Sequence, residues 1–158
     1  MIKRFLDSVI LIDHLNAIDV ASEYIQSLDP EETAISVITY AEIMVGIEKA
    51  DKAIVKSLLY QFTIFPIDIG IAGIAADLRQ QYGWKLPDAF QAAIAVHHNI
   101  RLITRNTKDF SPETHSFVEI PYILWFAIIQ DLRSLVAGAP RDDRGRGLCS
   151  SEWQNGCI

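Results

Sequence analysis

The feature that most constrains the fold of this chain is its alternation of short strand-like runs with longer runs of helical period. We expect strands over residues 2–6, 34–39, 63–67, 101–104 and 117–120. Between them, helical period predicts helices over residues 10–15, 20–28, 40–49, 52–61, 71–82 and 88–98. The first, second and fourth strands are short, apolar and bounded by polar residues, as in parallel sheets that helices cover on both faces. The sequence therefore predicts an α/β fold with a mostly parallel sheet of about five strands.

The length of 158 residues suits one domain, because single domains commonly have roughly 100–200 residues. We expect residues 1–122 to form this domain. The remaining residues, 123–158, read as an added helix, which we expect to begin near Pro121 and to end near Ala139, followed by a flexible tail rich in Gly, Arg and Asp.

Charge and cysteine usage limit the classes of partner and compartment. The formal net charge of −6 excludes a generally basic surface for nucleic acids, so any contact with RNA or DNA must be local. The two cysteines, Cys149 and Cys157, lie near the end of the chain, which favours a reducing compartment such as the cytoplasm. The first residues predict a strand and no signal peptide. The longest apolar run, residues 123–129, is too short to span a membrane, for which about 20 residues are needed.

Polar side chains that could carry chemistry follow the predicted strands. Asp7 ends the first strand, and Glu42 follows the second; Asn106 and Asp109 follow the fourth, and Asp88 opens the last predicted helix. Ligands of open parallel sheets bind outside the carboxyl ends of the strands. We therefore expect these side chains to reach one edge of the sheet.

Carboxylates that gather at one place repel each other unless a cation neutralises them. An oxygen-rich site of this kind suits Mg²⁺ or Mn²⁺, which keep several waters and bind substrate phosphate oxygens. The chemistry that follows is metal-assisted hydrolysis of a phosphodiester bond.

Each acid also has a structural explanation. Thr39 and Glu42 fit a capping box at a helix start, and Asp88 would be favoured there by the helix dipole. Asp109 could simply face solvent. Asp7 is the hardest to explain in this way, because an acid at the end of a buried strand needs a partner or a metal.

Four blocks of sequence containing these acids resemble the PIN domain, and within that family the VapC-type toxins of toxin–antitoxin systems. The blocks are FLDSVILID at 5–13, ITYAEIMVG at 38–46, LPDAFQAAIA at 86–95 and LITRNTKDF at 102–110. The resemblance covers about residues 1–120 and implies a Rossmann-like α/β/α fold with strand order 3-2-1-4-5. It also implies a Mg²⁺-dependent endoribonuclease, with Mn²⁺ as an alternative, that a small antitoxin protein inhibits.

The resemblance carries the family's acidic site over onto Asp7, Glu42 and Asp88, as metal ligands and catalytic groups. Many relatives have a fourth acid eighteen residues after the third, where this chain has Asn106. Either Asp109 replaces that acid, or Asn106 holds a metal-bound water as a neutral ligand. Val9 is a second departure, because relatives usually have a small polar residue there.

Both departures favour an alternative, a degenerate PIN domain that binds RNA or a partner without cleavage. A DNA-directed nuclease of the same fold is a further alternative.

Basic and apolar side chains near these blocks predict the partners. Lys85, Arg105 and Lys108 could bind RNA phosphates. Each could instead be a solvated surface cation, which is the favoured interpretation for Lys108. Trp84 and Phe110 could stack on bases, although packing in the core is the more common use of such residues.

The two helices predicted over residues 40–61 carry apolar stripes with more apolar side chains than are needed to cover a narrow sheet. These stripes consist of Ile43, Ile47, Ile54 and Leu58. The stripes therefore predict either an exposed face for a homodimer or an antitoxin, or an ordinary core.

Overall fold

Five parallel strands form one sheet in the order β3-β2-β1-β4-β5. The computed structural model describes residues 1–124, of which Met1–Ile123 form one compact unit. The strands are β1 (Arg4–Leu6), β2 (Thr33–Ser36), β3 (Thr63–Phe65), β4 (Arg101–Ile103) and β5 (Val118–Glu119). This sheet confirms the expected α/β fold and its strand order.

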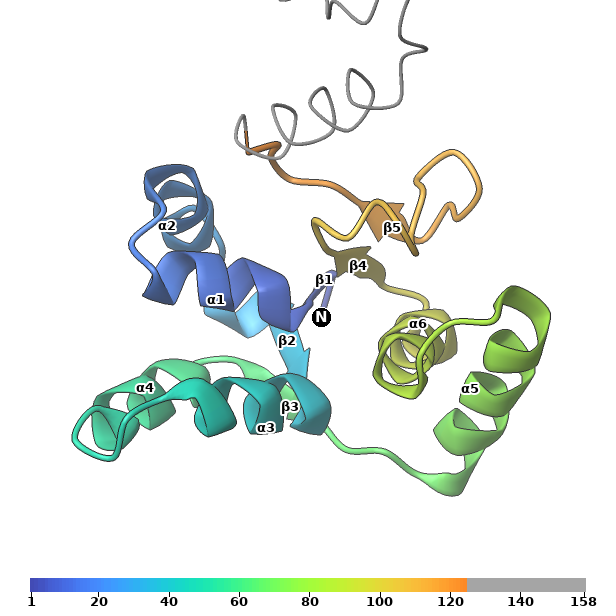
Figure 1. Cartoon of the computed structure of the whole chain (residues 1–158), viewed down its shortest axis with the longest axis horizontal. Helices are drawn as coiled ribbons and strands as arrows, with labels where there is room; N and C mark the ends of the chain where they lie inside the picture. The colour runs from blue at the N-terminus through green and yellow to red at the C-terminus, as the bar shows by residue number, and fades with distance from the viewer. Residues whose placement is uncertain (125–158) are drawn as a thin grey trace, which may run out of the picture. The chain divides into compact units, whose positions relative to one another are not determined.

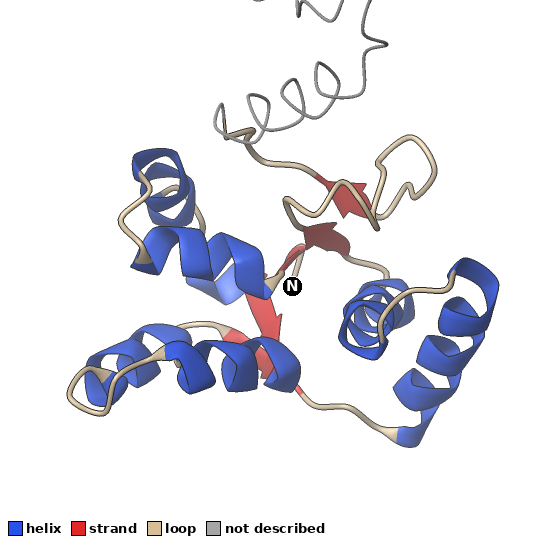
Figure 2. Ribbon diagram, in the orientation of Figure 1, coloured by secondary structure: helices blue, strands red, loops and turns tan. Residues whose placement is uncertain are grey.

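Helices cover both faces of the sheet (Figures 1 and 2). In the described residues they are α1 (Ser8–Leu15), α2 (Asp19–Gln26), α3 (Val37–Gly46), α4 (Lys52–Leu59), α5 (Ile69–Tyr82) and α6 (Leu86–His98), with a short 3-10 helix η1 (Pro30–Glu32). The first four helices lie on one face, and α5 and α6 lie on the other. The chain thus runs outward from β1 to β3 on one face and returns to β4 on the other. The strand order reverses between β1 and β4, and this is where open sheets bind ligands.

The hydrophobic core between the sheet and α6 depends on small side chains. Ala89, Ala92 and Ala93 are fully buried, and Phe5 of β1 and Leu102 of the adjacent β4 belong to the same cluster. Alanine lets the helix backbone approach the sheet closely while it keeps a high helix propensity. Helix α6, which carries Asp88, therefore packs directly on β1 and β4, the strands whose carboxyl ends lie beside Asp7.

The second strand is shorter than expected, because a serine ends it. The predicted strand continued to Thr39, but α3 begins at Val37, and the Ser36 hydroxyl accepts a hydrogen bond from the Thr39 backbone N–H at 2.9 Å. Ser36 is therefore the N-cap. The expected capping box of Thr39 and Glu42 is wrong, since both residues already lie within the helix.

Helix α6 begins at Leu86, two residues before the predicted start, with Pro87 in its first turn. Proline is favoured there because the missing N–H would have no partner in the helix. Asp88 consequently lies in the first turn of α6.

The helix expected to begin near Pro121 does not begin there, since residues 121–124 lie in no helix. The rest of that helix and the tail that follows it lie outside the described residues. Over the part of the chain that the structure describes, none of the helices has the length and apolar character needed to cross a membrane.

Candidate active site

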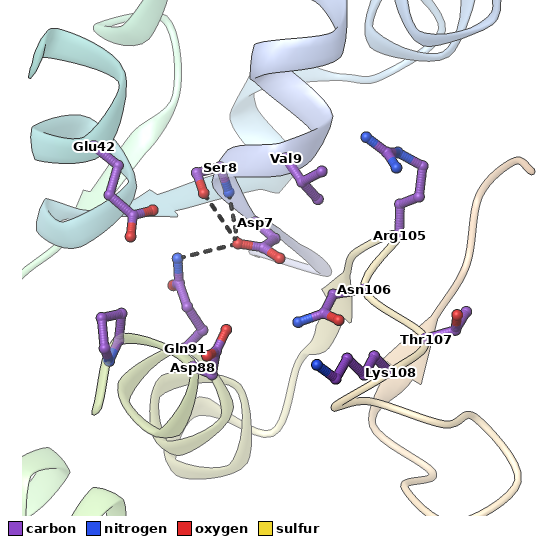
Figure 3. A pocket seen from close by; sticks show the side chains of 11 residues that line it. Asp7, Ser8, Val9, Glu42, Asp88, Gln91, Arg105, Asn106, Thr107 and Lys108 are labelled. Atoms are coloured by element: carbon purple, nitrogen blue, oxygen red, sulfur yellow. Dashed lines mark hydrogen bonds between the residues drawn. The ribbon is translucent and has the colours of Figure 1, made fainter. Parts of the chain in front are cut away.

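A cleft of about 430 Å³ opens at the carboxyl edge of the sheet, beside the point where the strand order reverses (Figure 3). Its walls come from the start of α1, from α3, from the start of α6 and from the loop after β4. The lining residues are Asp7, Ser8, Val9, Glu42, Pro87, Asp88, Gln91, Arg105, Asn106, Thr107 and Lys108. Three carboxylates from distant parts of the chain therefore face one cavity of a volume usual for ligand pockets, roughly 300–1,000 Å³.

Asp7 is the most constrained of these acids. Its Oδ1 accepts a hydrogen bond from the Ser8 backbone N–H at 2.7 Å, which makes it the N-cap of α1. Its Oδ2 accepts one from the Thr104 hydroxyl at 2.6 Å, and its own N–H donates to the Ile103 carbonyl at 3.0 Å. Both carboxylate oxygens are thus oriented by donors at the ends of β1 and β4.

Burial and mutual repulsion disfavour the charged forms of Asp7 and Asp88 in the cleft. Burial raises the pKa of Asp7, and the charge of Glu42 raises it further, against the hydrogen bonds from Thr104 and Ser8. Burial also raises the pKa of Asp88, and the charges of Asp109, Asp7 and Glu42 add to this effect, while Lys85 opposes it. A bound cation would relieve this repulsion.

The donor set fits a hard divalent cation that keeps part of its hydration shell. Carboxylate and amide oxygens are the ligands that Mg²⁺ and Mn²⁺ prefer. Within residues 1–124, no three Asp, Glu, His or Cys side chains are close enough to hold one ion jointly. Mg²⁺ is usually bound by one or two carboxylates together with waters and substrate phosphate.

Asn106 and Asp109 are joined to each other in the loop after β4. The Asn106 Nδ2 donates to Asp109 Oδ2 at 2.9 Å, and the Asn106 backbone N–H donates to the Thr104 hydroxyl at 3.0 Å. Asn106 lines the cleft, whereas Asp109 is not among its lining residues, and the charge of Asp109 raises the pKa of Asp88. The structure thus places the neutral amide in the cleft and the carboxylate where it orients that amide.

The basic residues singled out in the sequence differ in their placement. Arg105 lines the cleft, but its Nε and Nη2 donate to the Asp13 carboxylate at 2.7 and 2.8 Å. Lys108 also lines the cleft. Lys85 is not among the lining residues, but its positive charge lowers the pKa of Asp88.

Comparison with known proteins agrees with this geometry. The profile of the PIN domain matches residues 4–111. The chain belongs to the PIN-domain family. Among curated proteins, none matches the sequence.

Solved structures with the same fold include a chain of a toxin–antitoxin complex. A toxin–antitoxin complex from Klebsiella pneumoniae contains a chain with 38% identity and a TM-score of 0.72, and the match covers 77% of this chain and 100% of that one. A chain of FitAcB from Neisseria gonorrhoeae has 25% identity and a TM-score of 0.64, over 77% and 99% of the two chains. A chain of VapBC-1 from nontypeable Haemophilus influenzae has 26% identity and a TM-score of 0.55, over 72% and 93%. The fold is thus that of VapC-type PIN domains.

Two aromatic residues beside the cleft of this PIN domain belong to its core. Trp84 is 6% exposed and Phe110 is fully buried, and their ring centroids are 4.9 Å apart in an edge-on arrangement. The structure therefore confirms that both rings pack in the core, and their burial excludes stacking on bases. The contact joins the segment before Asp88 to the loop that carries Asn106.

Residues that hold the acids of this PIN domain were not singled out as functional in the sequence. Thr104 orients Asp7, and its position as the first polar residue after a buried strand is a signal that could have identified it. Gln91 is a polar residue within the alanine-rich inner face of α6, which is a weaker signal. Asp13 accepts hydrogen bonds from Tyr122 and from Arg105, and neither Asp13 nor Tyr122 carries a signal in the local sequence.

Proposed function

We propose that this chain is a Mg²⁺-dependent endoribonuclease and the toxin of a toxin–antitoxin pair. The observation that carries the proposal is the convergence of Asp7, Glu42 and Asp88 on one cleft where the strand order of a PIN domain reverses. The raised pKa of Asp7 and of Asp88 supports it, because both carboxyl groups are held where a cation would stabilise their charge.

The residues of the cleft would divide the work between metal binding and water positioning. Asp7 and Asp88 would bind Mg²⁺, or Mn²⁺ in its place. Glu42 would orient the attacking water, since no three acids of the described residues lie close enough to hold one ion jointly. Asn106 would complete the site as a neutral ligand, or Asp109 would do so in its place. A bound ion lowers the pKa of a water and offsets the charge that develops on the phosphate.

An acidic protein needs local positive charge to hold RNA. Lys108 and Arg105 line the cleft, and Lys85 lies near Asp88. The ion pair of Arg105 with Asp13 uses Nε and Nη2, so the Nη1 group lies outside that pair and could bind a phosphate. We propose that these cations bind the RNA backbone, which requires no base recognition.

The test is cleavage of a mixed RNA pool by the full chain with Mg²⁺ and with EDTA. Asp7→Asn and Asp88→Asn should each abolish cleavage, while both variants keep the circular dichroism spectrum of the wild type. Asp77→Asn on α5 is the matched control, because Asp77 is an exposed acid outside the cleft. Cleavage that persists in Asp7→Asn, or that is unaffected by EDTA, would refute the proposal.

A degenerate PIN domain that binds RNA or a protein without cleavage is the second candidate. It is favoured by the uncharged Asn106 and by the apolar Val9, both of which line the cleft. Titration with Mn²⁺ distinguishes the two, since a degenerate site would show no binding that depends on Asp7. Parallel assays on single-stranded DNA separate a DNA-directed nuclease from both.

The proposed partners are an antitoxin and a second copy of the chain. Ile43 of the predicted apolar stripes is buried in the core, but Ile54 on α4 is 73% exposed, and Val45 on α3 is 87% exposed. Such side chains on α3 and α4 support a protein interface on these helices. We expect a homodimer in solution that Ile54→Glu weakens, measured by light scattering. As a toxin that acts on RNA, the protein would work in the cytoplasm.

A further inference from the structure

Gln91 is a buried polar residue for which the proposed chemistry has no role. It lies on α6 one turn after Asp88, is 2% exposed, and lines the cleft (Figure 3). Its neighbours Ala92 and Ala93 are fully buried. A primary amide in such surroundings is costly unless its polar atoms are paired.

The amide of Gln91 is paired with the start of another helix. Its Oε1 accepts a hydrogen bond from the Ser36 hydroxyl at 3.0 Å, and its Nε2 donates to the Thr39 hydroxyl at 2.8 Å. Ser36 is the N-cap of α3, and Thr39 lies one turn before Glu42 on that helix. Gln91 thus connects the Asp88-bearing helix to the Glu42-bearing helix across 55 positions of sequence.

The same amide faces the third carboxylate. Nε2 lies 3.5 Å from Asp7 Oδ1, the oxygen that also accepts from the Ser8 N–H. The Thr39 hydroxyl in turn donates to the carbonyl of Leu6, the residue before Asp7, at 3.4 Å. These longer contacts are weaker than the bond to Thr39. Together they make the Gln91 side chain the junction of all three segments that carry the acids.

The geometry points to Gln91 as a positioning residue that sets the spacing of Asp7, Glu42 and Asp88. This inference rests on the proposed function, since the spacing of the carboxylates has a chemical consequence only if they bind an ion. Its physical basis is that the amide, the Ser36 hydroxyl and the Thr39 hydroxyl satisfy one another in this one arrangement. A displacement of either helix would leave buried polar atoms without partners.

The first test measures Mn²⁺ affinity of the full chain by electron paramagnetic resonance. Gln91→Met keeps the length of the side chain and removes its hydrogen bonds, and Thr39→Val removes the main partner. Residues that orient metal ligands typically contribute about 10- to 100-fold to affinity, so we expect each variant to lose roughly that much. The double variant should lose little more than the weaker-binding single variant, because both changes break one network.

Ile94→Val is the matched control, since Ile94 is fully buried on the same helix, one turn beyond Gln91. It should bind Mn²⁺ within about twofold of the wild type, because it removes only one buried methyl group from the core. Wild-type affinity in Gln91→Met, or an equal loss in Ile94→Val, would overturn the inference.

The second test needs no metal and therefore separates this inference from the proposed function. Amide hydrogen exchange reports the N–H groups of Ser8 and Thr39, which donate to Asp7 Oδ1 and Ser36 Oγ. Loss of the Gln91 bonds should accelerate exchange of both amides about fivefold, whereas Ile94→Val should leave them unchanged. Unchanged protection in Gln91→Met overturns the inference. Absence of Mn²⁺ binding by the wild type refutes the proposed function, and the exchange result still decides the role of Gln91.

Discussion

Replacing Asp13 with Asn should destabilise the protein strongly, although Asp13 lies outside the cleft. Asp13 on α1 is 6% exposed and accepts hydrogen bonds from Arg105 Nε and Nη2 and from the Tyr122 hydroxyl at 3.0 Å. The substitution keeps the shape of the side chain and leaves the guanidinium without its counter-ion.

The expected size follows from the exposure of the two partners. Breaking a fully buried ion pair costs about 3–5 kcal/mol. The Arg105 side chain is 28% exposed and can still reach water, so we expect a loss of about 2–3 kcal/mol. For a domain of this size that corresponds to a fall in Tm of roughly 10 °C.

The assay is urea unfolding followed by circular dichroism, on Asp13→Asn, Arg105→Met and the double variant. The double variant should be less destabilised than the sum of the two single variants, because each single change breaks the same pair. Glu32→Gln is the control: it breaks the exposed pair of Lys3 and Glu32 and should cost less than about 0.5 kcal/mol. A loss below that value for Asp13→Asn, or strict additivity in the double variant, would refute the reasoning.

Three further predictions concern the cleft and its supports. Without metal, Asp7→Asn should be at least as stable as the wild type at neutral pH, because Asn keeps the cap on α1 and removes a buried charge. Thermal melts should then show that Mg²⁺ raises the Tm of the wild type and not that of the variant. Because the folded state raises the pKa of Asp7 and Asp88 above the ordinary 3.8, it holds more protons than the unfolded chain at mildly acid pH. As pH rises from about 4, these groups should therefore lower the free energy of unfolding. Urea midpoints measured across pH should show a smaller decrease in this free energy for Asp88→Asn than for the wild type. Ser36→Ala should lose about 2 kcal/mol in the same urea assay, the upper end for an N-cap, since the buried Gln91 Oε1 loses a hydrogen bond in addition to the capped Thr39 N–H. A loss below about 0.5 kcal/mol would contradict that role.

Sequence reasoning identified the acids of the cleft because their signal is local. Asp7 follows a short apolar strand, as does the neutral Asn106 that lines the same cleft, and parallel strands bring their carboxyl ends to one edge. The motifs around these acids also carried the resemblance that implied the strand order. Sequence reasoning misplaced the start of α3, because the β-branched run through Thr39 favours a strand and Ser36 overrides it with one hydrogen bond.

The sequence by itself determined the element types, the sheet and the edge at which the acids lie, since periodicity and strand ends are properties of neighbouring residues. Only the tertiary structure decided the partners of those residues. Arg105 is paired with an acid 92 positions away, and Gln91 meets Ser36 across 55 positions. Such pairs depend on how helices pack on the sheet, and this packing minimises unpaired buried polar groups over the whole domain, so no local pattern encodes it.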